Sequence, residues 1–186
     1  DASGKHVFPG LIDCHLHYGF GEKITEYSTE TAYAAQGGFS TVLGYLLNNG
    51  SYDEVFEREL GYAKERSHVD FGFHLSMANE VQLQQMPHYI NDFGIGSFKY
   101  YMNFKGEEGR YMGLDGTDDG YLYELLETAA KFKDIVVVCH AENIEIVNRI
   151  RRKFQQEGRD TLRDWGLSKP AITEAAWDAF FAFYMD

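Results

Sequence analysis

Short apolar segments rich in β-branched and aromatic residues alternate with segments of helical periodicity along this chain of 186 residues. The expected strands are residues 10–17, 39–47, 69–77, 95–102 and 134–141. The expected helices lie near residues 26–36, 53–66, 80–92, 119–132, 142–157 and 173–185. This alternation is typical of parallel α/β folds, because consecutive parallel strands need a crossover that a helix usually provides.

Two parallel architectures fit five successive strand–helix units. A (β/α)8 TIM barrel has eight units, so this chain would supply strands one to five with their helices. An open, doubly wound sheet of the flavodoxin type is complete with five strands. It would need a glycine-rich loop that cradles a phosphate after the first strand, and HLHYGFGEK does not match the usual patterns. The choice between the two depends on the motifs.

Composition and charge limit the partners of the chain. Hydrophobic residues make up 44% of it, and the formal net charge is -12, from 29 acidic and 17 basic residues. That balance argues against a nucleic-acid backbone or an anionic membrane as the partner. No apolar run approaches the roughly 18 to 20 residues of a membrane span, and the stretch DASGKHVFPG lacks the charged-then-apolar layout of a signal peptide. Cys14 and Cys139 do not form a secretion-type framework, so a cytoplasmic location is expected.

The first motif is PGLIDCHLHYGFG, residues 9–21. Side chains alternate between the two faces of a strand, so His15 and His17 point to the same side. In parallel α/β folds, ligands gather at the carboxyl ends of the strands. Two imidazoles at such an end are candidate metal ligands, although strand histidines often only pack.

Two more strand ends carry a candidate ligand, Lys99 and His140. An unpaired ammonium inside the apolar stretch GSFKYYM would cost several kcal/mol or lose its proton. The alternatives for Lys99 are a salt bridge to a buried carboxylate or a side chain that reaches solvent at the strand end. A neutral lysine amine can add carbon dioxide, and the carbamate has two oxygens that can bridge two cations. His140, after the buried-type run IVVVC of a central strand, has an ordinary capping or packing role as its alternative.

Three segments in this order resemble the cyclic amidohydrolases of the hydantoinase, dihydropyrimidinase, dihydroorotase and allantoinase type: VFPGLIDCHLH, GSFKYYMNFKG and VVVCHAEN. The resemblance covers essentially the whole chain. It implies a (β/α)8 barrel with two divalent metal ions, commonly Zn²⁺. His15 and His17 would bind the more buried ion, Lys99 as its carbamate would bridge the two, and His140 would bind the second. A metal-bridging hydroxide would then open a small cyclic amide or imide.

Members of this family supply further ligands that lie beyond this sequence. They have another histidine at the end of the sixth strand and an aspartate at the end of the eighth. The sequence also lacks an initiator methionine and stops inside a helical pattern. We therefore expect residues 1–8 to be the remnant of a small β-sandwich domain and residues 9–186 to be the N-terminal part of the barrel. Such a fragment is expected to be inactive alone, and the full-length protein to be a homo-oligomer, a dimer or tetramer.

One position departs from the dihydropyrimidinase and hydantoinase pattern. Those enzymes have a tyrosine five residues after the lysine, which donates a hydrogen bond to the oxyanion of the tetrahedral intermediate. The residue here is Phe104. Tyr101 lies two residues from Lys99 on the same strand face, so it is the candidate substitute as a catalytic residue. Phe104 weakens the case for a dihydropyrimidine or hydantoin substrate and leaves dihydroorotate, allantoin or another cyclic amide open.

A non-catalytic assembly protein is the alternative function. Some relatives with this fold have lost their metal ligands and act as assembly proteins. The joint presence of His15, His17, Lys99 and His140 disfavours that alternative.

Three further local features are expected. Ser28 or Thr29 caps the first helix, His74 packs in the core, and residues 106–120 form a glycine-rich loop at the mouth of the site.

Overall fold

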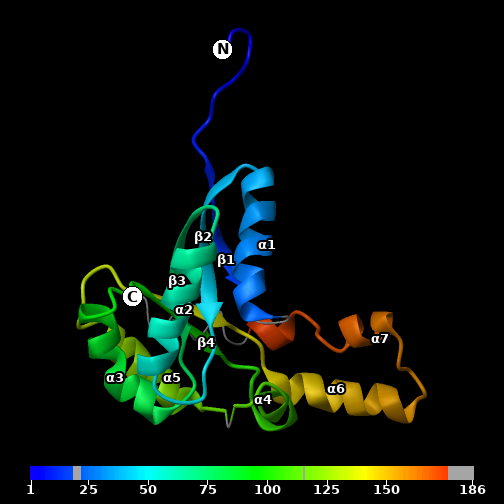
Figure 1. Ribbon diagram of the computed structural model, residues 1–186. Helices are drawn as coiled ribbons and strands as arrows, with labels where there is room; N and C mark the ends of the chain where they lie inside the picture. The colour runs from blue at the N-terminus through cyan, green and yellow to red at the C-terminus, as the bar shows by residue number, and fades with distance from the viewer. Residues whose placement is uncertain (19–21, 115, 176–186) are drawn as a thin grey trace.

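Five parallel strands form one curled sheet in the computed structural model, which describes residues 1–18, 22–114 and 116–175 (Figure 1). The strands are β1 (Leu11–His17), β2 (Phe39–Leu46), β3 (Asp70–Ser76), β4 (Ser97–Tyr101) and β5 (Val136–His140). Each differs from its expected range by at most two residues at either end. Their spatial order is β1-β2-β3-β4-β5, the same as their order in the chain. A doubly wound sheet reverses its strand order at a switch point, so the flavodoxin-type alternative is wrong and the sheet is part of a (β/α)8 barrel.

Helices follow the strands. They are α1 (Lys23–Gln36), α2 (Asp53–Arg66), α3 (Glu80–Asn91), α4 (Gly106–Tyr111), α5 (Asp119–Ala129), α6 (Ile144–Gln156) and α7 (Leu162–Leu167). Of these, α1, α2, α3 and α5 pack on one side of the sheet (Figure 1). The short helices α4 and α7 were not expected. The helix expected near 173–185 has its first turn at residues 172–175, and its remainder lies outside the described residues.

The start of α1 corrects one expectation. The helix begins at Lys23, one turn earlier than a cap at Ser28 or Thr29 would allow. The Thr29 hydroxyl instead donates to the carbonyl oxygen of Thr25 in the preceding turn, at 3.3 Å. A threonine inside a helix often bonds to the turn before it in this way, so it does not act as a cap.

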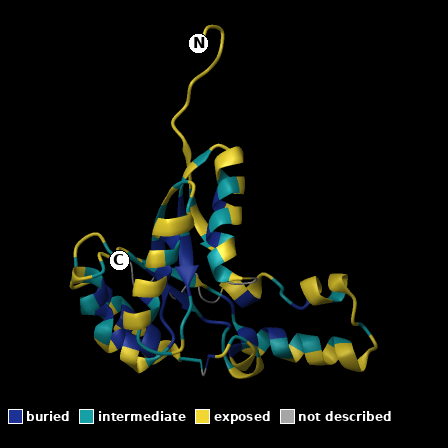
Figure 2. Cartoon of the chain, in the orientation of Figure 1, coloured by how far each residue is buried: buried dark blue, intermediate teal, exposed yellow. Residues whose placement is uncertain are grey.

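Large aromatic side chains fill the layer between the sheet and the helices. Tyr27, Tyr52, Tyr89 and Phe98 are fully buried members of this core. The buried positions of the chain gather on the strands and on the helix faces turned toward them (Figure 2). The Tyr52 hydroxyl lies 2.9 Å from the carbonyl oxygen of Leu46 and 2.7 Å from that of Ser76. It therefore connects the carboxyl ends of β2 and β3, which is the end of the sheet where ligands gather in barrels.

The N-terminal segment and the helices α6 and α7 extend away from the sheet. Residues 1–10 have no regular strand and extend from it, and α6 and α7 project to one side (Figure 1). Strand β5 was expected to be central, but among the described strands it is the outermost opposite β1. Val136 at its start is 55% exposed for that reason. Within the described residues, no helix combines the length and apolarity needed to cross a membrane.

Candidate metal centre

The register of the sheet determines which side chains meet at the carboxyl ends of the strands. His17 is paired with Tyr45 across β1 and β2, and Tyr45 is paired with His74 across β2 and β3. Tyr101 is paired with His140 across β4 and β5. Residues paired in this way lie on the same level of a parallel sheet, so His17, Tyr45 and His74 share one level. Strand β3 meets β4 with Ser76 paired to Lys99, so Tyr101 and His140 lie further toward the carboxyl ends than that level.

His15 and His17 gather around the ring of Tyr45. Their own ring centroids are 5.3 Å apart, and they lie 4.6 Å and 5.2 Å from the Tyr45 centroid. Burial, followed by the nearby charges of His15 and Lys99, lowers the pKa of His17. A neutral imidazole keeps a lone pair for a cation, so the pair has the chemistry that metal binding requires.

Lys99 is the central group of the site. Its residue exposure is 4%, and no carboxylate of the described residues forms an ion pair with it. Its Nζ instead lies 5.5 Å from the ring centroid of Tyr45 and 5.0 Å from that of Tyr101. Burial lowers the pKa of Lys99. The alternative of a buried salt bridge is therefore wrong for this part of the chain, and the amine has the environment that favours its neutral form.

His140 belongs to the same surface but is not within reach of the other two histidines. Its ring centroid lies 6.4 Å from that of Tyr101, which separates it from Lys99. No three side chains of His, Cys, Asp or Glu in the described residues come close enough to hold one metal ion together. His15 and His17 remain a pair of candidate ligands with ring centroids 5.3 Å apart. Lys99 would ligate a cation only after its amine is modified or deprotonated.

Glu142 lies beside the candidate ligand His140 and was not singled out from the sequence. Its Oε2 lies 2.9 Å from His140 Nε2, and its Oε1 lies 2.8 Å from Lys169 Nζ. Burial alone would raise the pKa of Glu142, but the hydrogen bonds from Lys169 and His140 hold it below its usual range. The sequence signal for Glu142 was an acidic residue two positions after a candidate ligand at a strand end. If such a carboxylate is buried, it needs a cation or a hydrogen-bond donor nearby.

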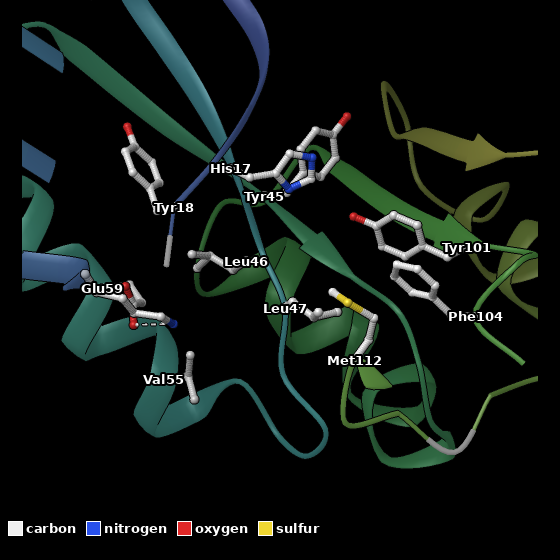
Figure 3. Close-up of a pocket in the computed structure, with 11 residues that line it drawn as sticks. His17, Tyr18, Tyr45, Leu46, Leu47, Val55, Glu59, Tyr101, Phe104 and Met112 are labelled. Carbon is white, nitrogen blue, oxygen red and sulfur yellow. Dashed lines mark hydrogen bonds and ion pairs between the residues drawn. The ribbon is translucent and has the colours of Figure 1, made fainter. Parts of the chain in front are cut away.

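Tyr101 and Phe104 lie side by side at the edge of the site. Their rings stack with centroids 4.4 Å apart and an interplanar angle of 23°. The Tyr101 hydroxyl points from β4 toward Tyr45 and His17, whereas Phe104 brings only a hydrocarbon edge to the same region (Figure 3). The only hydroxyl of this pair is therefore that of Tyr101.

A cavity of about 360 Å³ opens beside these residues. His17 and Tyr45 lie at one end of it, and Tyr101 and Phe104 form a wall (Figure 3). Its remaining lining is mostly apolar: Tyr18, Lys23, Leu46, Leu47, Val55, Glu59 and Met112. A concave, largely apolar site with a few polar groups at one end is typical of pockets for small molecules.

His74 has the packing role that was expected. It is 6% exposed, and its ring stacks on Tyr45 with centroids 4.5 Å apart. Tyr45 itself was missed by the sequence analysis, although it is the ring that His15, His17 and His74 share. Its position at the carboxyl end of the second strand was the available signal.

Comparisons with known proteins show what this chain is similar to. No protein-family model matches the chain. The chain is 33% identical over 183 residues to a D-hydantoinase of Geobacillus stearothermophilus, covering 94% of this chain and 37% of that protein. It is 33% identical over 181 residues to an allantoinase of Deinococcus radiodurans, covering 94% of this chain and 38% of that protein.

The solved structures agree with the sequence matches. A D-hydantoinase structure superposes with a TM-score of 0.77 and 30% identity, covering 91% of this chain and 37% of the other. The chain thus spans less than two fifths of the length of the relatives that it matches. By sequence and by fold, it is similar to the cyclic amidohydrolases that include the hydantoinases and allantoinases.

Proposed function

We propose that the chain is the N-terminal part of a metal-dependent hydrolase that opens the ring of a small cyclic amide or imide at a C–N bond. The observation that carries this proposal is the environment of Lys99. A lysine that is 4% exposed, has no carboxylate partner among the described residues and has a lowered pKa is not a stabilising feature of a core. Its Nζ lies near the rings of Tyr45 and Tyr101, and in this proposal it is the amine that adds carbon dioxide.

The donor set fits two divalent ions, for which we propose Zn²⁺. His15 and His17 would hold the first ion, the carbamate of Lys99 would bridge, and His140 would hold the second. Imidazole and anionic oxygen donors are ligands that zinc accepts. Bound there, the ions would supply a nucleophile at neutral pH and polarise the carbonyl of the substrate.

The side chains around the ions have their own tasks. The Tyr101 hydroxyl, which points into the site, would donate a hydrogen bond to the developing oxyanion in place of the tyrosine missing at Phe104. The apolar wall of the cavity would orient the substrate ring and exclude water from it.

The same proposal extends to the organisation of the whole protein. Residues 1–8 would belong to a small β-sandwich domain and residues 9–186 to the barrel, in a cytoplasmic homo-oligomer whose partner is the small-molecule substrate and not nucleic acid or membrane. The two cysteines, Cys14 and Cys139, are both free thiols, which agrees with a reducing compartment.

Metal content of the full-length gene product tests the proposal first. Purified with bicarbonate, it is expected to hold two ions per chain by plasma mass spectrometry, and Lys99→Ala is expected to lower that content. Lys131→Ala, at an exposed lysine on the outer surface, is the matched control. A panel of hydantoin, dihydrouracil, dihydroorotate and allantoin would then identify the substrate. Absence of metal and of ring opening in the full-length protein would favour the non-catalytic assembly relative.

A further inference from the structure

Three residues form a continuous polar chain that ends on His140. Its Nε2 lies 2.9 Å from Glu142 Oε2. Lys169 Nζ lies 2.8 Å from Glu142 Oε1 and 3.1 Å from Oε2, so it faces both oxygens of the carboxylate. The Glu142 side chain is 4% exposed, and the described residues bring no other charged group within ion-pairing distance of it.

We propose that Glu142, held by Lys169, is a positioning residue that fixes the tautomer and orientation of His140. This inference rests on the proposed function, in which His140 binds the second ion. A carboxylate oxygen can only accept, so the contact requires a proton on Nε2 of His140. A neutral ring then carries its lone pair on Nδ1, which is the nitrogen left for a cation. A carboxylate that holds the second nitrogen of a ligating histidine is a common way to orient the ring and raise its basicity.

Lys169 is itself held in place, so the series of contacts from Lys169 through Glu142 to His140 is not a chance surface contact. Its Nζ also lies 4.5 Å from the ring centroid of Trp165 on α7. The neighbouring Ser168 is fully buried. Four residues further on, the carbonyl oxygen of Thr173 accepts a hydrogen bond from the backbone N–H of Asn143, at 2.7 Å. The segment that carries Lys169 is therefore fastened to the residue next to Glu142.

The sequence position of Glu142 explains how its carboxylate is held next to His140. Glu142 lies between the end of β5 and the N-cap of α6, Asn143, whose side chain accepts from the N–H of Ile146. The capped helix start fixes the backbone next to Glu142, and the contacts with Lys169 and His140 hold its side chain. The carboxylate thus reaches His140 from a fixed direction.

Removal of Glu142 should weaken the second ion without affecting the first. Loss of such a partner typically lowers metal affinity about 10- to 100-fold. Glu142→Gln keeps the size of the side chain but removes its charge and can present either an oxygen or an N–H to His140. Lys169→Met removes the ammonium but keeps much of the stem, and Lys169→Arg retains a cation.

The test is a cobalt titration of the metal-free full-length protein with bicarbonate, followed by absorption and by mass spectrometry. The expected result is two classes of site in the wild type. In Glu142→Gln the first class keeps its affinity and the second weakens about 10- to 100-fold. Lys169→Met should weaken the second class less, and Lys169→Arg should restore it. Glu108→Gln, which removes the 2.8 Å ion pair with Arg151 between α4 and α6, is the matched control and should change neither class.

A second readout does not depend on metal. Long-range ¹⁵N–¹H spectra of the metal-free protein should show His140 with its proton on Nε2, and a mixture of tautomers in Glu142→Gln. A proton on Nδ1 in the wild type, or equal weakening of both classes of site, would overturn the inference. If the wild type binds no second ion, the proposed function fails, and the tautomer spectra still decide whether Glu142 positions His140.

Discussion

The Nε2 of His74 on β3 donates a hydrogen bond to the backbone carbonyl oxygen of Cys14 on β1, at 3.0 Å. Because a carbonyl only accepts, Nε2 carries the proton, and Nδ1 is free to accept from the hydroxyl of Ser97 on β4, with which it is in contact. One buried ring therefore connects the strand that carries His15 and His17 to the strand that carries Lys99.

Replacement of His74 by phenylalanine should destabilise the protein. The change keeps the ring but leaves the Cys14 carbonyl and the Ser97 hydroxyl without their partner. Both contacts are partly buried, and a typical hydrogen bond contributes a net of about 0.5–1.5 kcal/mol. The free energy of unfolding should therefore fall by about that amount for each lost bond in urea titrations. His6→Phe, in the exposed N-terminal segment, is the control. Equal stability of the two variants would show that His74 fills space only.

Lys99 should be required for metal uptake but should lower the free energy of unfolding. In the metal-free protein, Lys99→Met replaces a buried and unpaired amine with an apolar chain of similar length. We expect the free energy of unfolding to rise by about 1 kcal/mol or more, because the desolvation penalty is removed, while metal uptake is lost. Chemical denaturation of the chelated protein measures the first effect. A clear loss of stability would mean that Lys99 has a favourable partner.

The sequence predicted the strands well because their apolar β-rich runs are flanked by glycines and charged residues, and it predicted the helices α2 and α3 almost to the residue. It missed α4, since Gly106, Gly113 and Gly116 indicated a loop. All three have positive φ, but Glu107 and Glu108 occupy the first turn of a short helix between them.

The candidate site was predicted in part. His15, His17, Lys99 and His140 lie on one surface at the strand ends, because the period of a strand and the edge of a parallel sheet follow directly from the sequence. The partners Tyr45, Glu142 and Lys169 could not be assigned in this way. The contacts of these side chains depend on the strand register and on the path of the segment after α7 back toward β5. A single sequence contains neither.

A buried carboxylate joins α1 to α2 near the cavity. Glu59 is fully buried and accepts from the Tyr27 hydroxyl at 2.9 Å, with Arg58 at 3.0 Å and Lys23 at 3.4 Å. Tyr27→Phe should lower the free energy of unfolding by about 1.5–3 kcal/mol, which is typical for a hydrogen bond to a charged group. Tyr33→Phe, at an exposed position of the same helix, should have no measurable effect in the same denaturation series.

His88 should make part of the stability depend on pH. Its hydrogen bond to Asp92 and the charge of Asp53 raise the pKa of His88 in the folded state. A raised pKa means that the contribution is complete below the ordinary value of 6.5 and is lost as the pH rises through the folded-state pKa. The melting temperature of the wild type should therefore exceed that of His88→Gln at about pH 5.5, and the two should converge at about pH 8.5.

Added salt tests the contribution of the His88 ion pairs independently, again by comparing the wild type with His88→Gln. The His88 side chain is 41% exposed, so its ion pairs are screened by solvent ions. The difference in melting temperature at low pH should shrink as salt is added. A difference that persists at high pH would attribute the effect to packing of His88 against Phe93, whose ring centroid lies 4.7 Å away.

Tyr101 and Phe104 allow a reciprocal exchange that tests the origin of the oxyanion donor. In the full-length protein, Tyr101→Phe should lower kcat about 10²- to 10³-fold with little change in KM, because the hydroxyl acts on the transition state. Tyr101→Phe combined with Phe104→Tyr should recover part of this loss, since the rings stack at 4.4 Å and a hydroxyl on either one borders the same cavity. Phe104→Tyr alone should leave kcat near the wild-type value. Unchanged turnover in Tyr101→Phe would assign the oxyanion to another donor, and Tyr101 would then only pack against Phe104.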